Sequence, residues 1–431
     1  LTGPLTEDGQ WLYRLIALGR ISDTQVDHVP DDRALFAPSL TWRPNGATSL
    51  TLQASWQKDK TGSSSQFFPW SGVRTPNPNG KIPTNRFIGD LNDRYDSERT
   101  AFGWMLDHKL NDKWTLRQNV RLSDNDVEYN SLYGDSFSLA GGFAGDPVNQ
   151  RLLGRYAGFE KTKARLAAAD QNLSGDFSTG DVRHKLVAGL DAVRYTKQSD
   201  TFYDSPVYAG GGVPLIDVYD PVYVPYTPGP LVRQPKAGLR QTGVYLQDQL
   251  YWGNWIVVAG LRHDRASTTL QGQADDDSKA TSKRLGLMYT LGNGWVPYLS
   301  YAESFTPVAG TNPGTTTRFK PTRGEQIEAG IKYEPQDKAM SFSAAAYELR
   351  EKNRQVFVSP TVITQAGTTR TTGLELEFKG RLTPSTDIVS HYNYTDINDA
   401  VLEALPKHQA AIWAKHRFTL AGLPGFSIGG G

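Results

Sequence analysis

The sequence of 431 residues has no cysteine, almost no net charge and no long run of apolar residues. Without cysteine the chain can form no disulfide, no thiolate metal site and no cysteine nucleophile. Its 46 Lys and Arg residues nearly balance 45 Asp and Glu residues, so it lacks the clustered positive charge that accompanies nucleic-acid binding. The longest aliphatic-rich run, residues 255–261, is far shorter than the ~20 residues of a transmembrane helix. A helical membrane protein is thereby excluded.

Aromatic residues, by contrast, are abundant. The 10 Trp, 20 Tyr and 17 Phe residues are far more than a disordered chain carries. Apolar side chains recur with a period of two rather than 3.6. In residues 114–122 apolar side chains alternate with polar ones, and the same alternation runs through residues 102–110, 327–333 and 374–382. Each of these segments predicts a β-strand with one apolar and one polar face.

The connections between these strands alternate between short and long. Short turns are predicted near residues 6–9, 43–48, 111–113, 179–183, 252–254, 291–294, 335–339 and 421–425. Long connections are predicted at residues 58–98, 124–160, 196–238, 267–281, 306–322 and 352–370. Short turns at one end of the strands and long loops at the other are typical of a transmembrane β-barrel. A soluble all-β protein, such as a multi-domain sandwich or a propeller, is the alternative, but we find no repeat of the ~40–50 residues expected for propeller blades.

We therefore predict an all-β fold, a transmembrane antiparallel β-barrel with about 16 complete strands between Trp11 and Phe418. The apolar face of each strand would meet lipid and the polar face would line a wet lumen. The acidic side chains expected to line that lumen are Glu325, Glu328, Glu375 and Glu377.

Several short motifs follow one another along the chain. They are LYRLIAL (12–18), APSLTWRP (37–44), PNGKIP (78–83), RQNVR (117–121), QTGVYLQDQ (241–249), PYLSYAESFTP (297–307), EQIEAGIKYEP (325–335) and PKHQAAIW (406–413). In this order and spacing they resemble the TonB-dependent siderophore receptors of bacterial outer membranes, closest to receptors for ferrichrome and other hydroxamates. The resemblance implies a roughly 22-stranded barrel filled by an N-terminal plug domain. It also implies an outer-membrane receptor that binds a ferric siderophore at its extracellular loops and imports it with TonB-coupled energy.

The chain departs from that family pattern at both ends. Compared with the family, it lacks the plug, the first strand and most of the second, and about four further strands would follow Gly431. We therefore expect residues 1–431 to be one barrel domain that is incomplete at both ends. No signal peptide precedes Leu1, so the numbering is expected to start in the mature protein or inside a longer chain.

The resemblance also implies where ligand contacts lie. In the first long loop, Phe67 matches a ligand-contacting tryptophan of the family, with Phe68 and Trp70 beside it. In the second, Tyr133 matches a ligand tyrosine, and in the third Phe202 and Tyr203 fall near another contact. Aromatic side chains suit a compact, largely neutral trihydroxamate–iron complex, because they provide large flat surfaces at little entropic cost. Two family positions differ here and carry Ser65 and Asp135; loop packing or an interfacial aromatic girdle is the alternative role for each aromatic.

Motifs for other chemistries are weak. The seven histidines are scattered without zinc spacing, and the acidic run 275–277 has Ala280 where a calcium loop needs Gly. The Gly-rich segment 72–81 is followed by Ile82 where a phosphate loop needs Ser or Thr, and no serine-hydrolase elbow is present. We therefore predict no catalytic residue, no protein-bound metal and no cofactor.

Two other functions remain as alternatives. A passive porin would suit about 16 strands but would have no plug. An outer-membrane enzyme would need a Ser/His or Asp/His constellation at the barrel mouth. The predicted partners are a ferric siderophore, outer-membrane lipid and the TonB complex, reached through the plug, with no nucleic acid.

Overall fold

The computed structural model describes residues 1–431 except residues 64–65, 137–140, 311–316, 338, 360–361, 366 and 399–404. Regular structure in the described residues is almost entirely β-strand, with one short 3-10 helix, η1, at Val207–Ala209. The all-β prediction is confirmed. Within the described residues, no helix has the length and apolar character needed to cross a membrane.

The strands fall into long ones that build the wall and short ones that lie in loops. The long strands are β2 (Trp11–Arg20), β3 (Asp31–Trp42), β4 (Thr48–Thr61), β5 (Arg94–Lys109), β6 (Trp114–Gly134), β8 (Arg155–Thr179), β9 (Val182–Asp204), β12 (Ala237–Trp252), β13 (Trp255–Leu270), β14 (Asp276–Tyr289), β15 (Trp295–Thr306), β16 (Thr322–Tyr333), β17 (Met340–Lys352), β20 (Thr368–Thr383), β21 (Thr386–Ile397) and β22 (His408–Leu420). The others are β1 (Thr2–Pro4), β7 (Leu152–Leu153), β10 (Ile216–Asp217), β11 (Val232–Arg233), β18 (Gln355–Ser359), β19 (Val362–Gln365) and β23 (Leu423–Gly430). The long strands agree in number with the predicted 16.

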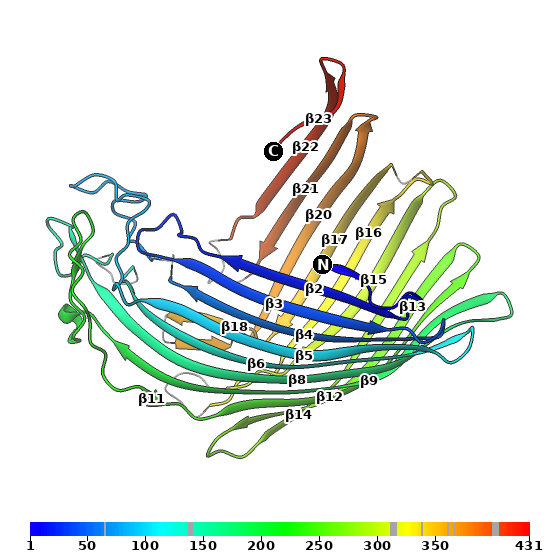
Figure 1. Cartoon of the computed structure of the whole chain (residues 1–431), viewed down its shortest axis with the longest axis horizontal. Helices are drawn as coiled ribbons and strands as arrows, with labels where there is room; N and C mark the ends of the chain where they lie inside the picture. Colours follow the sequence, from blue (N-terminus) through cyan, green and yellow to red (C-terminus); the bar gives the residue numbers. More distant parts are fainter. Residues whose placement is uncertain are drawn as a thin grey trace.

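Each long strand pairs antiparallel with the next one along the chain. The ladders run from β1–β2 through β2–β3 and onward to β21–β22 and β22–β23. The result is one strongly curved wall in which the blue and green strands face the orange and red ones (Figure 1). For the described residues, no ladder joins β1 or β2 to β22 or β23.

Short and long connections lie at opposite rims of this wall, as predicted. The two-residue turn between β8 and β9 and the one between β12 and β13 lie at the right in Figure 1, whereas the long connections gather at the left. One short turn was not predicted: residues 384–385 connect β20 to β21. The pair Pro384-Ser385 is a turn-forming pair, but the polar residues around it hide the break in alternation.

The predicted long loop at residues 124–160 is wrong at both ends, because the two strands that flank it extend further. Residues 124–134 continue β6 and residues 155–160 begin β8. Both faces of these extensions mix polar and apolar side chains, which removes the alternation that identifies a strand in a membrane. They are paired nevertheless, without a register shift, through Asp124↔Arg165 and Asp126↔Lys163.

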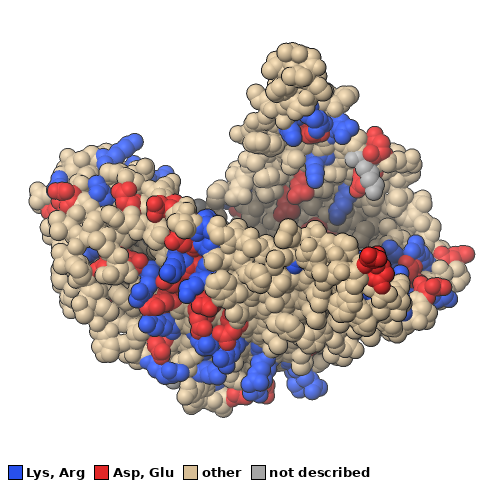
Figure 2. All heavy atoms as spheres, viewed as in Figure 1, with Lys and Arg blue, Asp and Glu red and all other residues tan. Residues whose placement is uncertain are grey.

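The outer face of these extensions forms a charged band. Its carboxylates and cations pair across strands: the Lys161 Nζ to Glu128 Oε1 distance is 3.3 Å, and the Arg165 Nε to Asp124 Oδ2 distance is 2.6 Å. Figure 2 shows such mixed charges between the loop rim at the left and a broad tan surface. On the outer face nearer the short turns, large apolar side chains such as Phe102 and Leu122 are each 45% exposed, as expected of a surface that faces lipid.

Of the four acidic residues predicted to line the lumen, Glu325 is predicted on the wrong face. The Tyr298 hydroxyl donates to the Glu328 carboxylate at 2.7 Å, and the register places Glu328, Glu375 and Glu377 on one face through the pairs that they make along β17. Glu325 is three residues from Glu328, so a period of two puts it on the opposite face. There it pairs with Lys352 at 3.8 Å.

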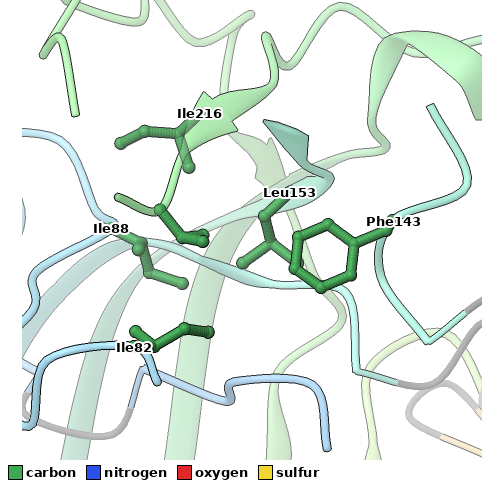
Figure 3. Packing of buried hydrophobic residues seen from close by; sticks show 6 residues of the cluster. Ile82, Ile88, Phe143, Leu153 and Ile216 are labelled. Atoms are coloured by element: carbon green, nitrogen blue, oxygen red, sulfur yellow. The ribbon is translucent and has the colours of Figure 1, made fainter. Parts of the chain in front are cut away.

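The long loops at the left rim pack into a loop cap, which we define as the described residues of 21–30, 62–93, 135–154 and 205–236. Its largest core joins three of the four loops and consists of Ile82, Ile88, Phe143, Leu153, Ile216 and Val218. The five labelled members in Figure 3 point toward one another from separate chain segments. A second core joins Val26, Val29 and Phe87, and a third joins Leu132, Ala157 and Val213. The cap is therefore held by buried apolar surface, in the manner of a soluble domain.

Candidate ligand-binding site

Four aromatic rings form a continuous series where the wall meets the cap. We call Phe67, Tyr133, Tyr156 and Tyr203 the aromatic row. Phe67 lies edge-on to Tyr133 with ring centroids 5.9 Å apart, Tyr133 is 6.0 Å from Tyr156, and Tyr156 stacks on Tyr203 at 5.6 Å. Three predicted site residues, from three chain segments, are thus brought together.

Strand register explains how the row forms. Tyr133 on β6 pairs directly with Tyr156 on β8, so their side chains leave the same face of the sheet. Tyr203 on β9 pairs with Gly158, two residues from Tyr156 and therefore also on that face. Because Gly158 has no side chain, the tyrosine rings can approach one another above it.

Phe67 reaches the row because the first long loop crosses the end of β6 closely. The Gly134 amide donates to the Gln66 carbonyl at 3.2 Å. A Cβ at Gly134 would lie 2.7 Å from the Phe67 carbonyl oxygen, so glycine is required there. Phe67 itself has φ of 51°, in the left-handed region. The Gln66 side chain, which accepts from the Ile88 amide at 2.8 Å, helps to hold this conformation.

The row is open to solvent at both ends. Phe67 and Tyr203 are each 48% exposed, while Tyr133 and Tyr156 are half-buried. The surface therefore offers aromatic faces and phenol hydroxyls together, which suits a compact organic ligand with few charges.

The other predicted site residues lie elsewhere. Phe68 packs against the largest core of the cap. Phe202 is adjacent to Tyr203 on a strand and so points to the opposite face, where its ring lies 6.1 Å from Phe159. Trp70 is 71% exposed, and the Arg74 guanidinium lies 5.7 Å from its ring centroid. A ligand contact at these three positions remains a prediction.

Sequence reasoning missed Tyr156. It lies in the stretch that was predicted to be a long loop, one residue after the start of β8. A signal was present, since extending the β6–β8 register outward from the apolar strand segments places Tyr156 opposite Tyr133.

Of the two positions that depart from the family pattern, Asp135 and Ser65, the structure describes Asp135. Asp135 is fully buried, its amide donates to the Gly154 carbonyl at 2.9 Å, and its carboxylate accepts from the Tyr208 hydroxyl. Asp135 thus links the second loop to the third inside the cap. Ser65 lies outside the described residues.

The residue that follows Tyr203 in the chain, Asp204, accepts a hydrogen bond from another tyrosine. The Tyr226 hydroxyl donates to Asp204 Oδ2 at 2.6 Å, and burial together with this carboxylate raises the pKa of Tyr226 above its usual value. Tyr226 therefore stays a neutral hydrogen-bond donor at ordinary pH. Across the described residues, no group of three or more His, Asp or Glu side chains is placed to hold a metal ion.

Comparison with known proteins shows the family to which the chain belongs. Residues 39–431 match the family described as TonB dependent receptor-like, beta-barrel. The chain is 31% identical over 468 aligned residues to the ferrichrome outer membrane transporter/phage receptor of Escherichia coli K12, covering 99% of this chain and 60% of that protein. It is 32% identical over 448 residues to the ferrioxamine B receptor of Salmonella typhimurium SL1344, covering 100% and 61%. The chain thus spans about three fifths of the length of these relatives.

Solved structures match the fold at lower identity. The ferric-catecholate import receptor Fiu of Escherichia coli K12, in its closed form, superposes with a TM-score of 0.82 at 20% identity, over 97% of this chain and 66% of that one. The siderophore receptor PiuA of Acinetobacter baumannii gives a TM-score of 0.81 at 19% identity, over 94% and 65%. At these identities the likeness establishes the barrel architecture alone.

Proposed function

Because the chain belongs to the TonB-dependent receptor β-barrel family, we propose that the whole protein captures a ferric siderophore of the hydroxamate type and imports it with TonB-coupled energy. The chain is an outer-membrane β-barrel, as its family is. The observation that carries the proposal is the aromatic row, which stands at the loop rim and is drawn from three segments.

The ligand class follows from chemistry and from similarity together. Two relatives more than 30% identical are named for ferrichrome and ferrioxamine, both hydroxamate siderophores. In such a complex the hydroxamates fill the coordination sphere of the iron, so the protein needs no metal ligand of its own. Recognition then depends on flat apolar contact with a few hydrogen-bond donors, and the row provides both.

The remaining parts of the proposal concern the whole protein. The ferric ion arrives as part of the ligand, and we propose neither a resident cofactor nor a catalytic step. Energy coupling would pass from TonB through a plug domain, which the family resemblance implies outside residues 1–431. Outer-membrane lipid would surround the apolar face of the wall.

Uptake measurements test this proposal. The natural full-length protein would be expressed in receptor-deficient cells supplied with radioactive ferric ferrichrome or ferric ferrioxamine B, with and without functional TonB. We expect saturable uptake of at least one complex that stops without TonB. Uptake that persists without TonB would favour the passive porin, and no uptake of either complex would contradict the hydroxamate assignment.

A further inference from the structure

Each tyrosine of the Tyr133–Tyr156 pair has a buried residue behind it on its strand. Side chains alternate along a strand, so Leu132 and Arg155 leave the face opposite to the row. Leu132 is 1% exposed and Arg155 is 2% exposed. Whatever holds these two residues also fixes the backbone that carries the tyrosines.

Arg155 binds two loops of the cap at once. Its Nη1 donates to the carbonyls of Ile88 at 2.9 Å and Gly89 at 3.0 Å, both in the first long loop. Its Nε donates to the Pro214 carbonyl at 3.2 Å, in the third. A buried arginine is costly unless its charge is balanced and its donors are used, and the planar guanidinium can serve several carbonyls together.

Asp93 and Asp90 lie near enough to Arg155 for their charges to act on it, and Asp93 also holds the other strand. Its Oδ2 accepts from the Leu132 amide at 3.0 Å and from the Asp90 amide at 3.0 Å. Asp90 in turn accepts from the Tyr226 amide at 2.6 Å through Oδ2. The network therefore connects β6, β8, the first loop and the third loop directly behind the row.

From this geometry we propose that Arg155 is a positioning residue for ligand binding, which aligns Phe67, Tyr133, Tyr156 and Tyr203 without touching the ligand. This inference rests on the proposed function. Phe67 belongs to the first loop, which Arg155 binds. Tyr133 follows Leu132, whose amide donates to Asp93. Tyr156 follows Arg155 directly in the chain. Loss of Arg155 would let the loops and the two strands shift independently.

The charge on Asp93 gives this role a pH signature. Burial raises the pKa of Asp93 from about 3.8 to about 7; the Leu132 and Asp90 amides and the Arg155 charge oppose the rise, whereas the Asp90 charge adds to it. The ionisable groups that face Asp93 are Asp90 on its own loop, Arg155 on β8 and Tyr129 on β6. A raised carboxyl pKa stabilises the cap fully below about pH 4, and this contribution is lost as pH rises through about 7. Without Arg155, the pKa of Asp93 would rise further.

Binding titrations of the full-length receptor test the inference. Dissociation constants for ferric ferrichrome and ferric ferrioxamine B would be measured between pH 5 and 9. Arg155→Met should weaken binding tenfold or more at pH 7.5 and move the midpoint of the pH dependence upward. Arg155→Lys keeps the charge, so its midpoint should stay near that of wild type while part of the affinity loss remains.

Two further variants complete the design. Arg151→Met is the matched control, because the Arg151 Nε bonds to Asp217 Oδ2 at 2.8 Å within the cap but lies outside the network behind the row; its affinity should stay within twofold of wild type. Asp93→Asn keeps an acceptor for the Leu132 amide and should abolish the pH step.

The outcomes separate the inference from the proposed function. If wild type binds and Arg155→Met binds within twofold of it at every pH, the positioning role is wrong. If Arg155→Met fails to assemble, Asp93→Asn decides, and a pH step that persists in that variant overturns the inference. If wild type binds neither probe, the proposed function fails, and the positioning role fails with it.

Discussion

The loop cap and the barrel wall differ in how the same chain is stabilised. In the cap, Ile88, Leu153 and Val213 are fully buried, so apolar surface is removed from water. In the wall, Leu122 and Leu190 are 45% and 56% exposed, and adjacent strands are joined by continuous ladders. Because lipid hydrocarbon offers no hydrogen-bond partner to the backbone, the hydrogen bonds between adjacent strands stabilise the wall. The cap is therefore stabilised like a soluble protein and the wall like a membrane protein. Different kinds of substitution should destabilise the two regions.

The largest effect is expected from a cavity in the cap. Ile88→Ala should cost about 2–5 kcal/mol of cap stability, because it empties a fully buried site in the largest core. Hydrogen exchange of the four cap loops would measure the loss. Val224→Ala, at a side chain that is 57% exposed in the same cap, should change stability by less than about 0.5 kcal/mol. Unfolding of the wall together with the cap in Ile88→Ala would show that the two regions are not independent.

A charge on the outer face of the wall should destabilise the wall rather than the cap. Val120 lies six residues from the short-turn end of β6, on the apolar face, and Val120→Arg should destabilise the barrel by about 2–4 kcal/mol near the bilayer midplane. Asn119→Arg points to the lumen and faces Asp170 in the register, so it should be tolerated. The measurement is refolding stability in lipid vesicles. Equal effects of the two changes would reverse the assigned faces.

A substitution in the aromatic row should weaken ligand binding without changing the stability of the cap or of the wall. Tyr133→Ala should weaken ferric hydroxamate binding by about 1–3 kcal/mol, the range for losing an aromatic contact. Trp252→Ala is the control, since Trp252 is an exposed aromatic that ends β12 beside a short turn, at the rim opposite to the row. An equilibrium titration in which Tyr133→Ala keeps full affinity would remove this residue from the site.

The smallest effect is expected at the charged band. Lys163 pairs with Asp126 at 3.2 Å on an exposed surface, where ion pairs contribute little and are screened by salt. Lys163→Ala should leave the thermal midpoint of the barrel unchanged within error in 0.15 M salt. A measurable drop would mean that the band contributes to the stability of the wall.

The sequence allowed the wall to be predicted better than the cap. Alternation in residues 114–122 identified β6 because lipid and lumen impose opposite polarity on its two faces. That signal ends where the strand leaves the membrane, so residues 124–134 were predicted to be loop. Tyr156 was missed for the same reason.

The site was predicted only in part because contacts between loops have no sequence period. Phe67 and Phe68 look equivalent in the sequence, yet one joins the row and the other packs into the cap core. Phe202 and Tyr203 could have been separated, since adjacent strand residues point to opposite faces. The family resemblance indicated which loops carry the aromatics but not which faces they occupy.

The length of β6 has a consequence for how a ligand is captured. Tyr133 is nine residues beyond Asp124, where the charged band begins, and nine residues at ~3.3 Å each extend about 30 Å along the strand. Even for a strand tilted by ~40°, this height exceeds the ~8 Å over which salt screens a surface charge at physiological ionic strength. A diffusing complex would therefore meet the tyrosines before it experiences the electrostatic potential of the membrane surface. The encounter rate should depend little on the charge of the surrounding lipid headgroups.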